Sequence, residues 1–314
     1  MTEPLCDLPP VVAVVGATAT GKSDLAVALA QRLDGEVVNA DSMQLYRGMD
    51  VGTAKLTVAE RGGVPHHLLD VWDVRQAANV ADYQRMTRAV FAEVGRRGRT
   101  PVLVGGSGLY VRAAVDDLAF PGTDDEVRRR LEAELAAEGP TALHARLAGL
   151  DPAAAAAILP SNGRRVVRAL EVVELTGEPF AASLPEPTYA VPTVQLGLAL
   201  ERALLDDRIE RRVDRMWGRG LVDEVRALEA RGLREGRTAS RALGYAQVLR
   251  HLAGEWSERR AREETVRATR RFARRQESWF RRDPRVRWLD AAEPSDLLVR
   301  AESALADLGY LRRS

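Results

Sequence analysis

The stretch VVAVVGATATGKSDLAVALA, residues 11 to 30, decides the fold of this 314-residue chain. Its first six residues form a short, mostly β-branched run that ends in glycine, which is typical of a fully buried strand. Apolar residues at helical spacing follow from Lys22 onward. Between them lies GATATGKS, which fits the phosphate-binding loop pattern with Gly16, Gly21, Lys22 and Ser23 in place. The stretch therefore predicts a strand, a phosphate-binding loop and a helix.

The chemistry of this loop follows from its residue types. Small residues let backbone N–H groups point inward, and the N-terminus of the following helix adds positive potential. Lys22 can bridge phosphate oxygens, and the Ser23 hydroxyl can bind Mg²⁺. We therefore expect phosphate contacts along the whole loop: Gly16, Ala17, Thr18, Ala19, Thr20, Gly21, Lys22 and Ser23. The loop alone does not name the phosphate compound that it holds.

Two more buried-strand patterns follow, GEVVNADS at 35 to 42 and TPVLVGGSG at 100 to 108, with an amphipathic helical pattern between them at 80 to 98. Strands that alternate with helices predict an α/β fold, a P-loop NTPase-like parallel sheet flanked by helices. Ligands of such sheets bind beyond the carboxyl ends of the strands. The phosphate loop, Asp41 and residues 105 to 108 should therefore meet at one edge.

The chain is expected to divide into three regions. Residues 1 to 119 form the first part of the core, and residues 120 to 190 have an almost entirely helical pattern that predicts an inserted helical domain. TVQLGLAL, at 193 to 200, is another buried-strand pattern. Residues 191 to 314 should therefore return to the core and continue as a basic, helical C-terminal region.

Composition limits the class of protein. With 46% hydrophobic residues the chain can bury a substantial core, and its single cysteine, Cys6, excludes an internal disulfide. No apolar run approaches the roughly 20 residues of a membrane span, and no signal-peptide pattern is present. We expect a cytoplasmic protein without a membrane segment, acting as a monomer.

Basic residues are unevenly distributed. The net charge is only +1, yet residues 259 to 287 contain twelve arginines and four acidic residues. Such a segment is typical of a polyanion-binding surface, and a solvated helix face is the alternative. Lysine occurs only twice, at Lys22 and Lys55, which marks both as candidate sites for a compact ammonium group. For Lys55 a structural salt bridge and a substrate contact both remain open.

Asp41 is the acidic residue expected nearest the phosphate loop. An NTPase needs an acid at the end of a second strand to hold its metal ion, and VLVGGSG has none. Asp41, at the end of EVVNAD, can be either a metal ligand or a general base. Its spacing does not distinguish the two roles.

Eight ordered motifs resemble the tRNA dimethylallyltransferase, or IPP transferase, family of tRNA-modifying enzymes. They are GATATGKSDLAVALA, DSMQLYRGMDVGTAK, PHHLLDVWD, GGSGLY, RRVVRALEV, RRVDRMWGRGLVDEVRAL, ALGYAQ and ARRQESWF. The resemblance implies transfer of the dimethylallyl group from dimethylallyl diphosphate to N6 of the adenosine immediately 3′ of the anticodon in tRNA, with diphosphate released. The phosphate loop would then hold the diphosphate.

The same resemblance implies catalytic roles. Asp41 would accept the N6 proton, and the hydroxyl of Ser107, where the family usually has threonine, would face the scissile oxygen. Arg208, with Arg212 as second choice, would stabilise the leaving diphosphate together with Mg²⁺ bound at Ser23.

An anticodon stem–loop is the implied partner of the remaining motifs, with 120 to 190 as a tRNA-binding insertion. The adenosine would contact Asp41, Ser42, Met43 and Gln44. Backbone phosphates suit arginine, and unstacked bases suit planar side chains. The implied RNA contacts are Arg128, Arg164, Arg165, Arg168, Arg241, Gly244, Tyr245, Arg274, Arg275, Gln276, Trp279 and Arg281.

Three other functions remain as alternatives. A P-loop nucleotide kinase or ATPase fits the bare loop, but the second-strand acid is missing. An adenylate isopentenyltransferase acting on AMP would need neither the helical insertion nor the basic C-terminal region. A catalytically silent RNA-binding protein would have no use for Lys22, Ser23, Asp41 and the Ser107 hydroxyl. Met216 and Trp217, on the apolar side of their helical pattern, are expected in the core.

Overall fold

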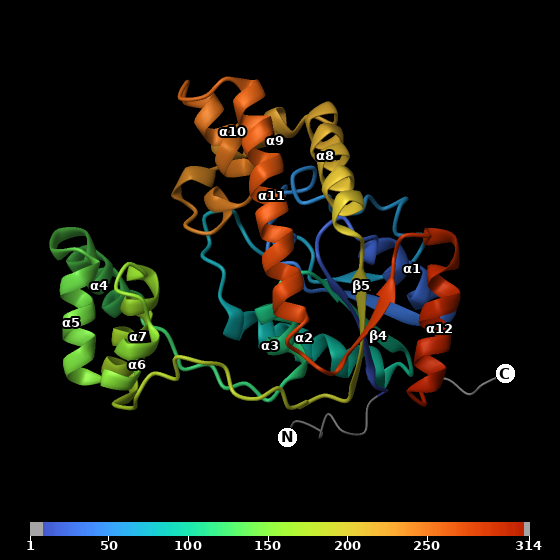
Figure 1. The fold of residues 1–314 in the computed structure, drawn as a ribbon, viewed down its shortest axis with the longest axis horizontal. Coiled ribbons are helices and arrows are strands. Elements are labelled where there is room, and N and C mark those ends of the chain that lie inside the picture. The colour runs from blue at the N-terminus through green and yellow to red at the C-terminus, as the bar shows by residue number, and fades with distance from the viewer. Residues whose placement is uncertain (1–8, 311–314) are drawn as a thin grey trace. The chain divides into compact units, whose positions relative to one another are not determined.

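Six strands form one parallel sheet in the computed structural model, which describes residues 9–310. The strands lie in the order β3-β2-β4-β1-β5-β6, so the phosphate-loop strand β1 is central (Figure 1). Their bounds are β1 Val11–Gly16, β2 Gly35–Asn39, β3 His66–His67, β4 Thr100–Gly105, β5 Thr193–Ala199 and β6 Val286–Asp290. The predicted α/β class with a parallel sheet is confirmed. Cys6 lies outside the described residues.

Helices cover both faces of the sheet, which is why β1 and β2 can be buried along their whole length. On one face Val12 and Val14 of β1 pack in the same core as Leu25 and Leu29 of α1 and Leu305 of α12. Figure 1 shows α2, α3 and α11 on the opposite side of the strands. The helices are α1 Lys22–Arg32, α2 Val80–Arg96, α3 Gly108–Val115, α11 Glu258–Phe280 and α12 Leu297–Asp307.

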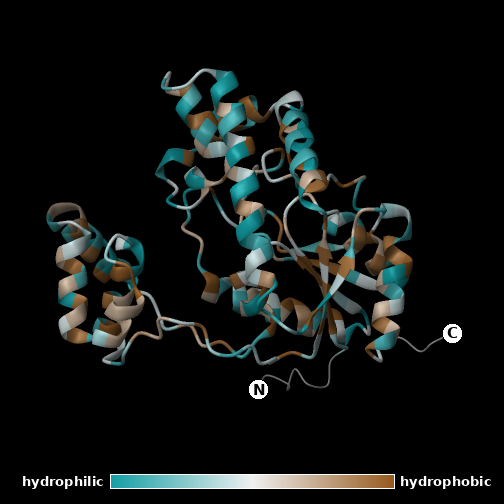
Figure 2. Ribbon diagram, viewed as in Figure 1, coloured by the Kyte–Doolittle hydropathy of each residue, from teal (hydrophilic) through white to brown (hydrophobic). Residues whose placement is uncertain are grey.

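The C-terminal region is helical and polar before it rejoins the sheet. Its elements are α8 Arg202–Gly218, α9 Leu221–Glu229, η2 Leu233–Glu235, η3 Ala239–Arg241, α10 Tyr245–Leu252, α11, β6, η4 Pro294–Asp296 and α12. Figure 2 shows that α8 and α11 are largely hydrophilic. The return to the sheet through β6, which pairs in parallel with β5, was not predicted. None of the helices within residues 9–310 is long and apolar enough to cross a lipid bilayer.

Residues 118–187 form a separate compact unit, where the sequence predicted a helical insertion at 120 to 190. Its helices are α4 Asp125–Glu138, α5 Pro140–Leu150, α6 Pro152–Ala157 and α7 Gly163–Thr176. Leu131, Leu143, Leu147 and Leu170 are buried in a core that belongs to this unit alone. Asp151 accepts a hydrogen bond from Ala154 N and so caps α6. The unit therefore has the hydrophobic core and helix capping of an independent domain.

Candidate active site

The phosphate loop lies between β1 and α1, as its sequence predicts. Gly21 takes the left-handed conformation, with φ 90°, at the N-cap of α1. The Lys22 ammonium donates a hydrogen bond to the carbonyl oxygen of Ala17 at 2.5 Å, and the Thr20 hydroxyl donates to the same oxygen at 2.9 Å. Lys22 is therefore folded back over its own loop, at the position from which it can reach a bound phosphate.

The electrostatic environment of Lys22 disfavours its charged form. Burial, and after it the nearby Arg212 guanidinium, lower the pKa of Lys22, and Asp41 opposes them, so that the pKa is about 7. Burial also lowers the pKa of Arg212, and the Asp41 carboxylate again opposes the shift. Two partly buried cations thus have one carboxylate nearby. A bound polyanion would stabilise the positive charges of both Lys22 and Arg212.

A cavity of about 660 Å³ opens beside the loop. Lys22 and Ser23 line it from α1, and the segment after β2 contributes Asp50 and Lys55. α8 and its C-cap residue contribute a row of basic side chains: Arg208, Arg212 and Arg215 from the helix and Arg219 from the C-cap. Their spacing of four, three and four residues places them on one helix face. The wall is therefore suited to binding a phosphate group.

The two candidate arginines of α8 differ in their surroundings. The Arg208 guanidinium donates to the carbonyl oxygens of Ala291 and Ala292, at 3.4 and 3.2 Å. Arg212 interacts electrostatically with Asp41 and Lys22 and donates to the carbonyl oxygen of Thr53 at 3.1 Å. This geometry favours Arg212 over Arg208, the choice made from the sequence, because Arg212 interacts with both the loop lysine and the acid; which of the two stabilises a diphosphate stays a prediction.

Asp41 follows β2 and is held in a fixed turn. Asn39 Oδ1 accepts from the Asp41 backbone N–H at 2.9 Å, and Asn39 Nδ2 donates to the Asp41 carbonyl oxygen at 3.0 Å. Asp41 Oδ1 accepts from the Met43 N–H at 2.9 Å. One carboxylate oxygen is thereby fixed by its own turn. Asp41, Ser42, Met43 and Gln44 are all half-buried, so their side chains remain accessible to a ligand.

Ser107 joins the end of β4 to the end of β2. Its hydroxyl oxygen accepts a hydrogen bond from the Ser42 N–H at 3.3 Å and lies 3.3 Å from the Ser42 hydroxyl. The sequence predicted that these strand ends would meet, and here they are in direct contact. Ser107 thus presents a hydroxyl beside the segment that carries Asp41.

The glycines around Ser107 are required by the close approach of α11. A Cβ on Gly106 would lie 2.2 Å from Gln276 Nε2, and a Cβ on Gly108 would lie 2.1 Å from the Trp279 ring. Gln276 Nε2 donates to the Gly106 carbonyl oxygen at 2.9 Å, and Gln276 Oε1 accepts from the Thr18 N–H at 2.9 Å. α11 is therefore bonded to both the phosphate loop and the end of β4.

Some expected RNA contacts on α10 and α11 are corrected by burial. Tyr245 is 0% exposed and donates its hydroxyl proton to Glu224 at 2.6 Å, and Gln276 is buried between Thr18 and Gly106. Neither side chain can contact RNA in this structure. Gly244 is also buried and begins α10 with φ 87°.

The other expected RNA contacts of the same motifs are exposed, as that expectation requires. Trp279 is 37% exposed, although its ring also packs against Gly108. Arg281 lies over the Trp288 ring, with its guanidinium carbon 4.3 Å from the ring centroid. The remaining exposed members are Arg241, Arg274 and Arg275.

In residues 118–187 the expected RNA-binding arginines mainly stabilise the unit itself. Arg128 and Arg168 both pair with Glu171, whose side chain is buried, at 2.7 and 2.8 Å. The Arg165 guanidinium donates to the Ala182 carbonyl oxygen. Arg128 and Arg168 thus share one buried carboxylate and leave a net positive charge, and both side chains are partly exposed, so the expected RNA contact of each stays a prediction. Arg164 is exposed.

Lys55 is a structural residue in this arrangement. Its side chain is 3% exposed, and its ammonium lies 2.6 Å from both Asp50 Oδ1 and Asp70 Oδ1. It also donates to the Tyr46 carbonyl oxygen at 3.1 Å. Although Lys55 lines the cavity, it is fully engaged in fixing the segment that follows Asp41.

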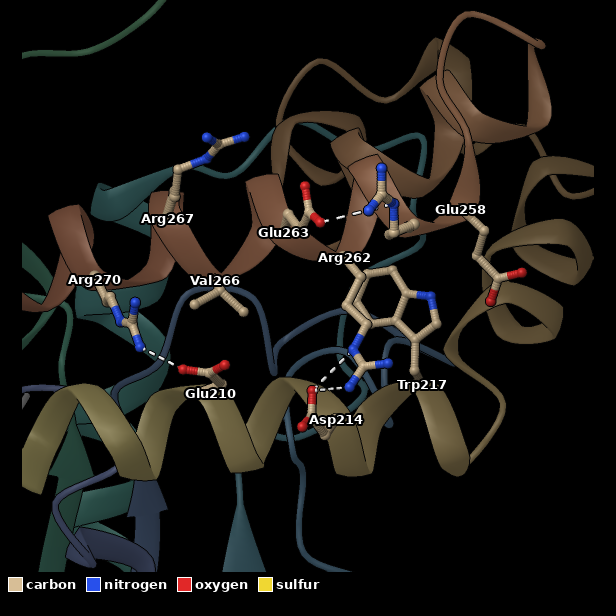
Figure 3. Close-up of a pocket in the computed structure, with 10 residues that line it drawn as sticks. Glu210, Asp214, Trp217, Glu258, Arg262, Glu263, Val266, Arg267 and Arg270 are labelled. Carbon is tan, nitrogen blue, oxygen red and sulfur yellow. Dashed lines mark hydrogen bonds and ion pairs between the residues drawn. The ribbon is translucent and has the colours of Figure 1, made fainter.

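A second cavity, of about 640 Å³, lies between α8 and α11 (Figure 3). Two ion pairs cross it: Arg262 Nε to Asp214 Oδ1 at 2.8 Å, and Arg270 Nη2 to Glu210 Oε2 at 2.7 Å. They join the helix that carries Arg212 to the helix that carries Gln276. Met216 is buried as expected, but Trp217 is only half-buried and lines this cavity.

Comparisons with known proteins agree with this geometry. The model of the IPP transferase family matches residues 44–283. Proteins named tRNA dimethylallyltransferase from Thermobifida fusca and Streptomyces avermitilis are 71% and 72% identical, over 93% and 90% of this chain and 92% and 91% of theirs.

Solved structures are similar as well. The tRNA isopentenylpyrophosphate transferase of Bacillus halodurans has a TM-score of 0.71 at 42% identity, covering 95% of this chain and 96% of that one. A eukaryotic dimethylallyltransferase acting on tRNA has a TM-score of 0.81 at 26% identity, covering 96% of this chain and 78% of that one. Sequence, fold and site agree: the chain belongs to the IPP transferase family.

Proposed function

We propose that this protein transfers the dimethylallyl group from dimethylallyl diphosphate to N6 of the adenosine immediately 3′ of the anticodon in tRNA. The observation that carries the proposal is the basic cavity beside the phosphate loop, whose Lys22 and Arg212 interact electrostatically with Asp41, while Ser107 is bonded to Ser42, the residue after Asp41. A diphosphate in that cavity would have its ester end near both side chains. The names of the relatives support the same reaction.

The leaving diphosphate is the part of the reaction that the cavity stabilises. As the bond from N6 to the allylic carbon forms, the bond from that carbon to the diphosphate oxygen breaks, and its electron pair leaves with the diphosphate. Lys22, the loop amides and Arg212 would stabilise the developing charge. Ser107 would donate a hydrogen bond to the scissile oxygen.

The acceptor nitrogen needs a base. N6 of adenine is a poor nucleophile, and it loses one proton as the new bond forms. The free oxygen of the Asp41 carboxylate would take that proton, while its turn holds the other oxygen on Met43 N–H. Ser42 and Gln44 would position the base.

Mg²⁺ is the proposed metal ion, with the Ser23 hydroxyl as its protein ligand. Ser23 lines the cavity at the start of α1. Mg²⁺ needs only one or two protein ligands when substrate phosphates supply others, which fits a single hydroxyl at this wall. Its charge would offset that of the diphosphate.

tRNA is the proposed macromolecular partner, bound through its anticodon stem–loop. An adenosine stacked in that loop must be extruded before it can react, at a cost of a few kcal/mol. Exposed Trp279 offers a ring for an unstacked base, and Arg274 and Arg275 offer charge for phosphates. We also propose that the protein acts as a cytoplasmic monomer.

A labelling experiment tests the proposal. The purified protein, Mg²⁺ and dimethylallyl diphosphate labelled in its prenyl group are incubated with an anticodon stem–loop RNA, with AMP or with ATP. The proposal predicts label in the stem–loop alone. Label in AMP would indicate an adenylate prenyltransferase. Phosphate released from ATP, with no prenyl transfer to any acceptor, would indicate an ATPase.

A further inference from the structure

The carboxylate of Glu224, on α9, is bonded to the backbone of a segment far away in the sequence. Its Oε2 accepts from the N–H groups of Asp50 and Val51, at 3.1 and 2.7 Å. Its Oε1 accepts from the Gly52 N–H at 3.1 Å and from the Tyr245 hydroxyl at 2.6 Å. Four donors thus use the full accepting capacity of one carboxylate.

This arrangement is built for a carboxylate and for a glycine at position 52. Three consecutive N–H groups form a concave anion site, and charge-assisted bonds of this kind are roughly twice as strong as neutral ones. A Cβ on Gly52 would lie 2.5 Å from the Tyr245 ring, so the backbone passes directly over that ring. Burial and the Glu224 carboxylate raise the pKa of Tyr245, which keeps its hydroxyl a donor.

The segment bonded to Glu224, residues 50 to 52, is followed directly by a residue that contacts the active site. Thr53, the next residue, accepts at its carbonyl oxygen from Arg212 Nη2 at 3.1 Å and from Gln44 Nε2 at 3.3 Å. Arg212 lines the diphosphate cavity, and Gln44 belongs to the segment that we assign to the adenosine. The Thr53 carbonyl oxygen therefore orients one residue of the diphosphate site and one residue of the adenosine site.

We infer that Glu224 is a positioning residue for prenyl transfer. By fixing residues 50 to 52 it places the Thr53 carbonyl oxygen, and that oxygen holds Arg212 toward the diphosphate and Gln44 toward the base. Glu224 itself touches neither substrate. The inference rests on the proposed function, because it assigns a reaction to the site that Glu224 supports.

The test compares Glu224→Gln with Asp223→Asn in the full-length protein. Glutamine keeps the shape of glutamate, but it loses the charge and replaces one accepting oxygen by an NH₂ group. Asp223 is the adjacent acid on α9, is exposed and pairs only locally with Arg226, so it is a matched control. Transfer to a stem–loop RNA, RNA affinity, melting temperature and amide hydrogen exchange are measured for both.

For Glu224→Gln we expect kcat to fall about 10- to 100-fold, as for a misplaced catalytic group. RNA affinity should stay near wild type, the melting temperature should fall while the protein remains folded at the assay temperature, and exchange at residues 50 to 52 should accelerate. Asp223→Asn should match wild type in all four.

Two outcomes would overturn the inference: faster exchange at residues 50 to 52 with unchanged kcat, or a kcat that falls only in proportion to the folded fraction. Failure of wild type itself to modify the stem–loop would instead refute the proposed function. In that case hydrogen exchange would still test whether Glu224 fixes residues 50 to 52.

Discussion

Gln276 accepts a hydrogen bond from the Thr18 backbone N–H at 2.9 Å, across 258 residues of sequence. Through this contact α11, which carries the exposed Trp279, is bonded to the loop that we assign to the diphosphate. The same side chain donates to the Gly106 carbonyl oxygen, one residue before Ser107. The three segments of the active site are therefore held together by one buried amide.

Replacing Gln276 by leucine should weaken this junction. The buried Gly106 carbonyl oxygen would lose its side-chain donor, at a cost of about 1–3 kcal/mol in the free energy of unfolding. We also expect a higher KM for dimethylallyl diphosphate, because Thr18 loses its support. Denaturant unfolding and steady-state kinetics measure the two effects, with Ser278→Ala, exposed on the same helix, as the control. An unchanged unfolding free energy would contradict this role.

Lys22 should make binding of dimethylallyl diphosphate depend on pH. Burial lowers the pKa of Lys22 in the protein to about 7, and a bound diphosphate would raise it again. Above pH 7 binding must therefore take up a proton, so affinity should fall, by at most about tenfold per pH unit. Calorimetry at several pH values above 7 measures how the affinity changes with pH, and Lys22→Met should abolish this pH dependence. An affinity that rises with pH would exclude this explanation.

The same shift affects stability in the opposite direction. The folded pKa of Lys22 lies below its ordinary value of 10.5, so the unfolded chain binds more protons between about pH 7 and 10.5. The contribution of Lys22 should therefore make the free energy of unfolding rise with pH in this window. Lys22→Met should lose this contribution, which denaturant unfolding at several pH values can measure.

Asp41→Ala should separate catalysis from RNA binding. Loss of the base should lower kcat by about 10²–10⁴-fold, because proton transfer from N6 has no other positioned acceptor. Affinity for the stem–loop should change little, since most RNA affinity comes from phosphate contacts. Single-turnover transfer and a filter-binding assay measure the two quantities. Equal losses in both would make Asp41 a binding or structural residue.

Arg212 should matter more than Arg208 for the chemical step. Removing a preorganised donor to developing charge typically costs about 10²–10³-fold in kcat, which we expect for Arg212→Gln. Arg208→Gln should have a smaller effect, because its guanidinium is bonded to the carbonyls of Ala291 and Ala292. The comparison is made at saturating dimethylallyl diphosphate. A larger loss of kcat for Arg208→Gln would instead support Arg208, the residue first chosen from the sequence.

Trp279→Ala should weaken binding of the stem–loop. Stacking of a base on an aromatic ring contributes about 1–3 kcal/mol, and Trp279 is the exposed ring next to Ser107. Trp279→Phe should retain most of the affinity, since phenylalanine also stacks. Fluorescence titration with labelled RNA measures this order. Equal affinities for all three proteins would show that Trp279 only packs against Gly108.

Local sequence patterns were sufficient for much of the fold. VVAVVG is a continuous apolar run, and such a run predicts a buried strand without any knowledge of its partners. β6 could not be predicted in this way, because its sequence VRWLD contains two charged residues, Arg287 and Asp290, and is not a continuous apolar run. It is a strand because β5, whose paired residues lie 91 positions earlier, pairs with it.

The positions of the phosphate loop and of Asp41 could be predicted because each motif lies within one segment. The motif position of Tyr245 and Gln276 did not reveal that both are buried, because burial depends on Glu224, Thr18 and Gly106 in distant segments. Arg215 and Arg219 were missed, although their helical spacing from Arg208 was visible in the sequence.

The most direct test is to locate the transferred group. An anticodon stem–loop is incubated with the protein, Mg²⁺ and dimethylallyl diphosphate, digested with nuclease and analysed by mass spectrometry, beside a stem–loop with guanosine at the target position. The account predicts one dimethylallyl group on the adenosine immediately 3′ of the anticodon and none on the guanosine variant. Modification at another nucleotide, or equal modification of both RNAs, would contradict it.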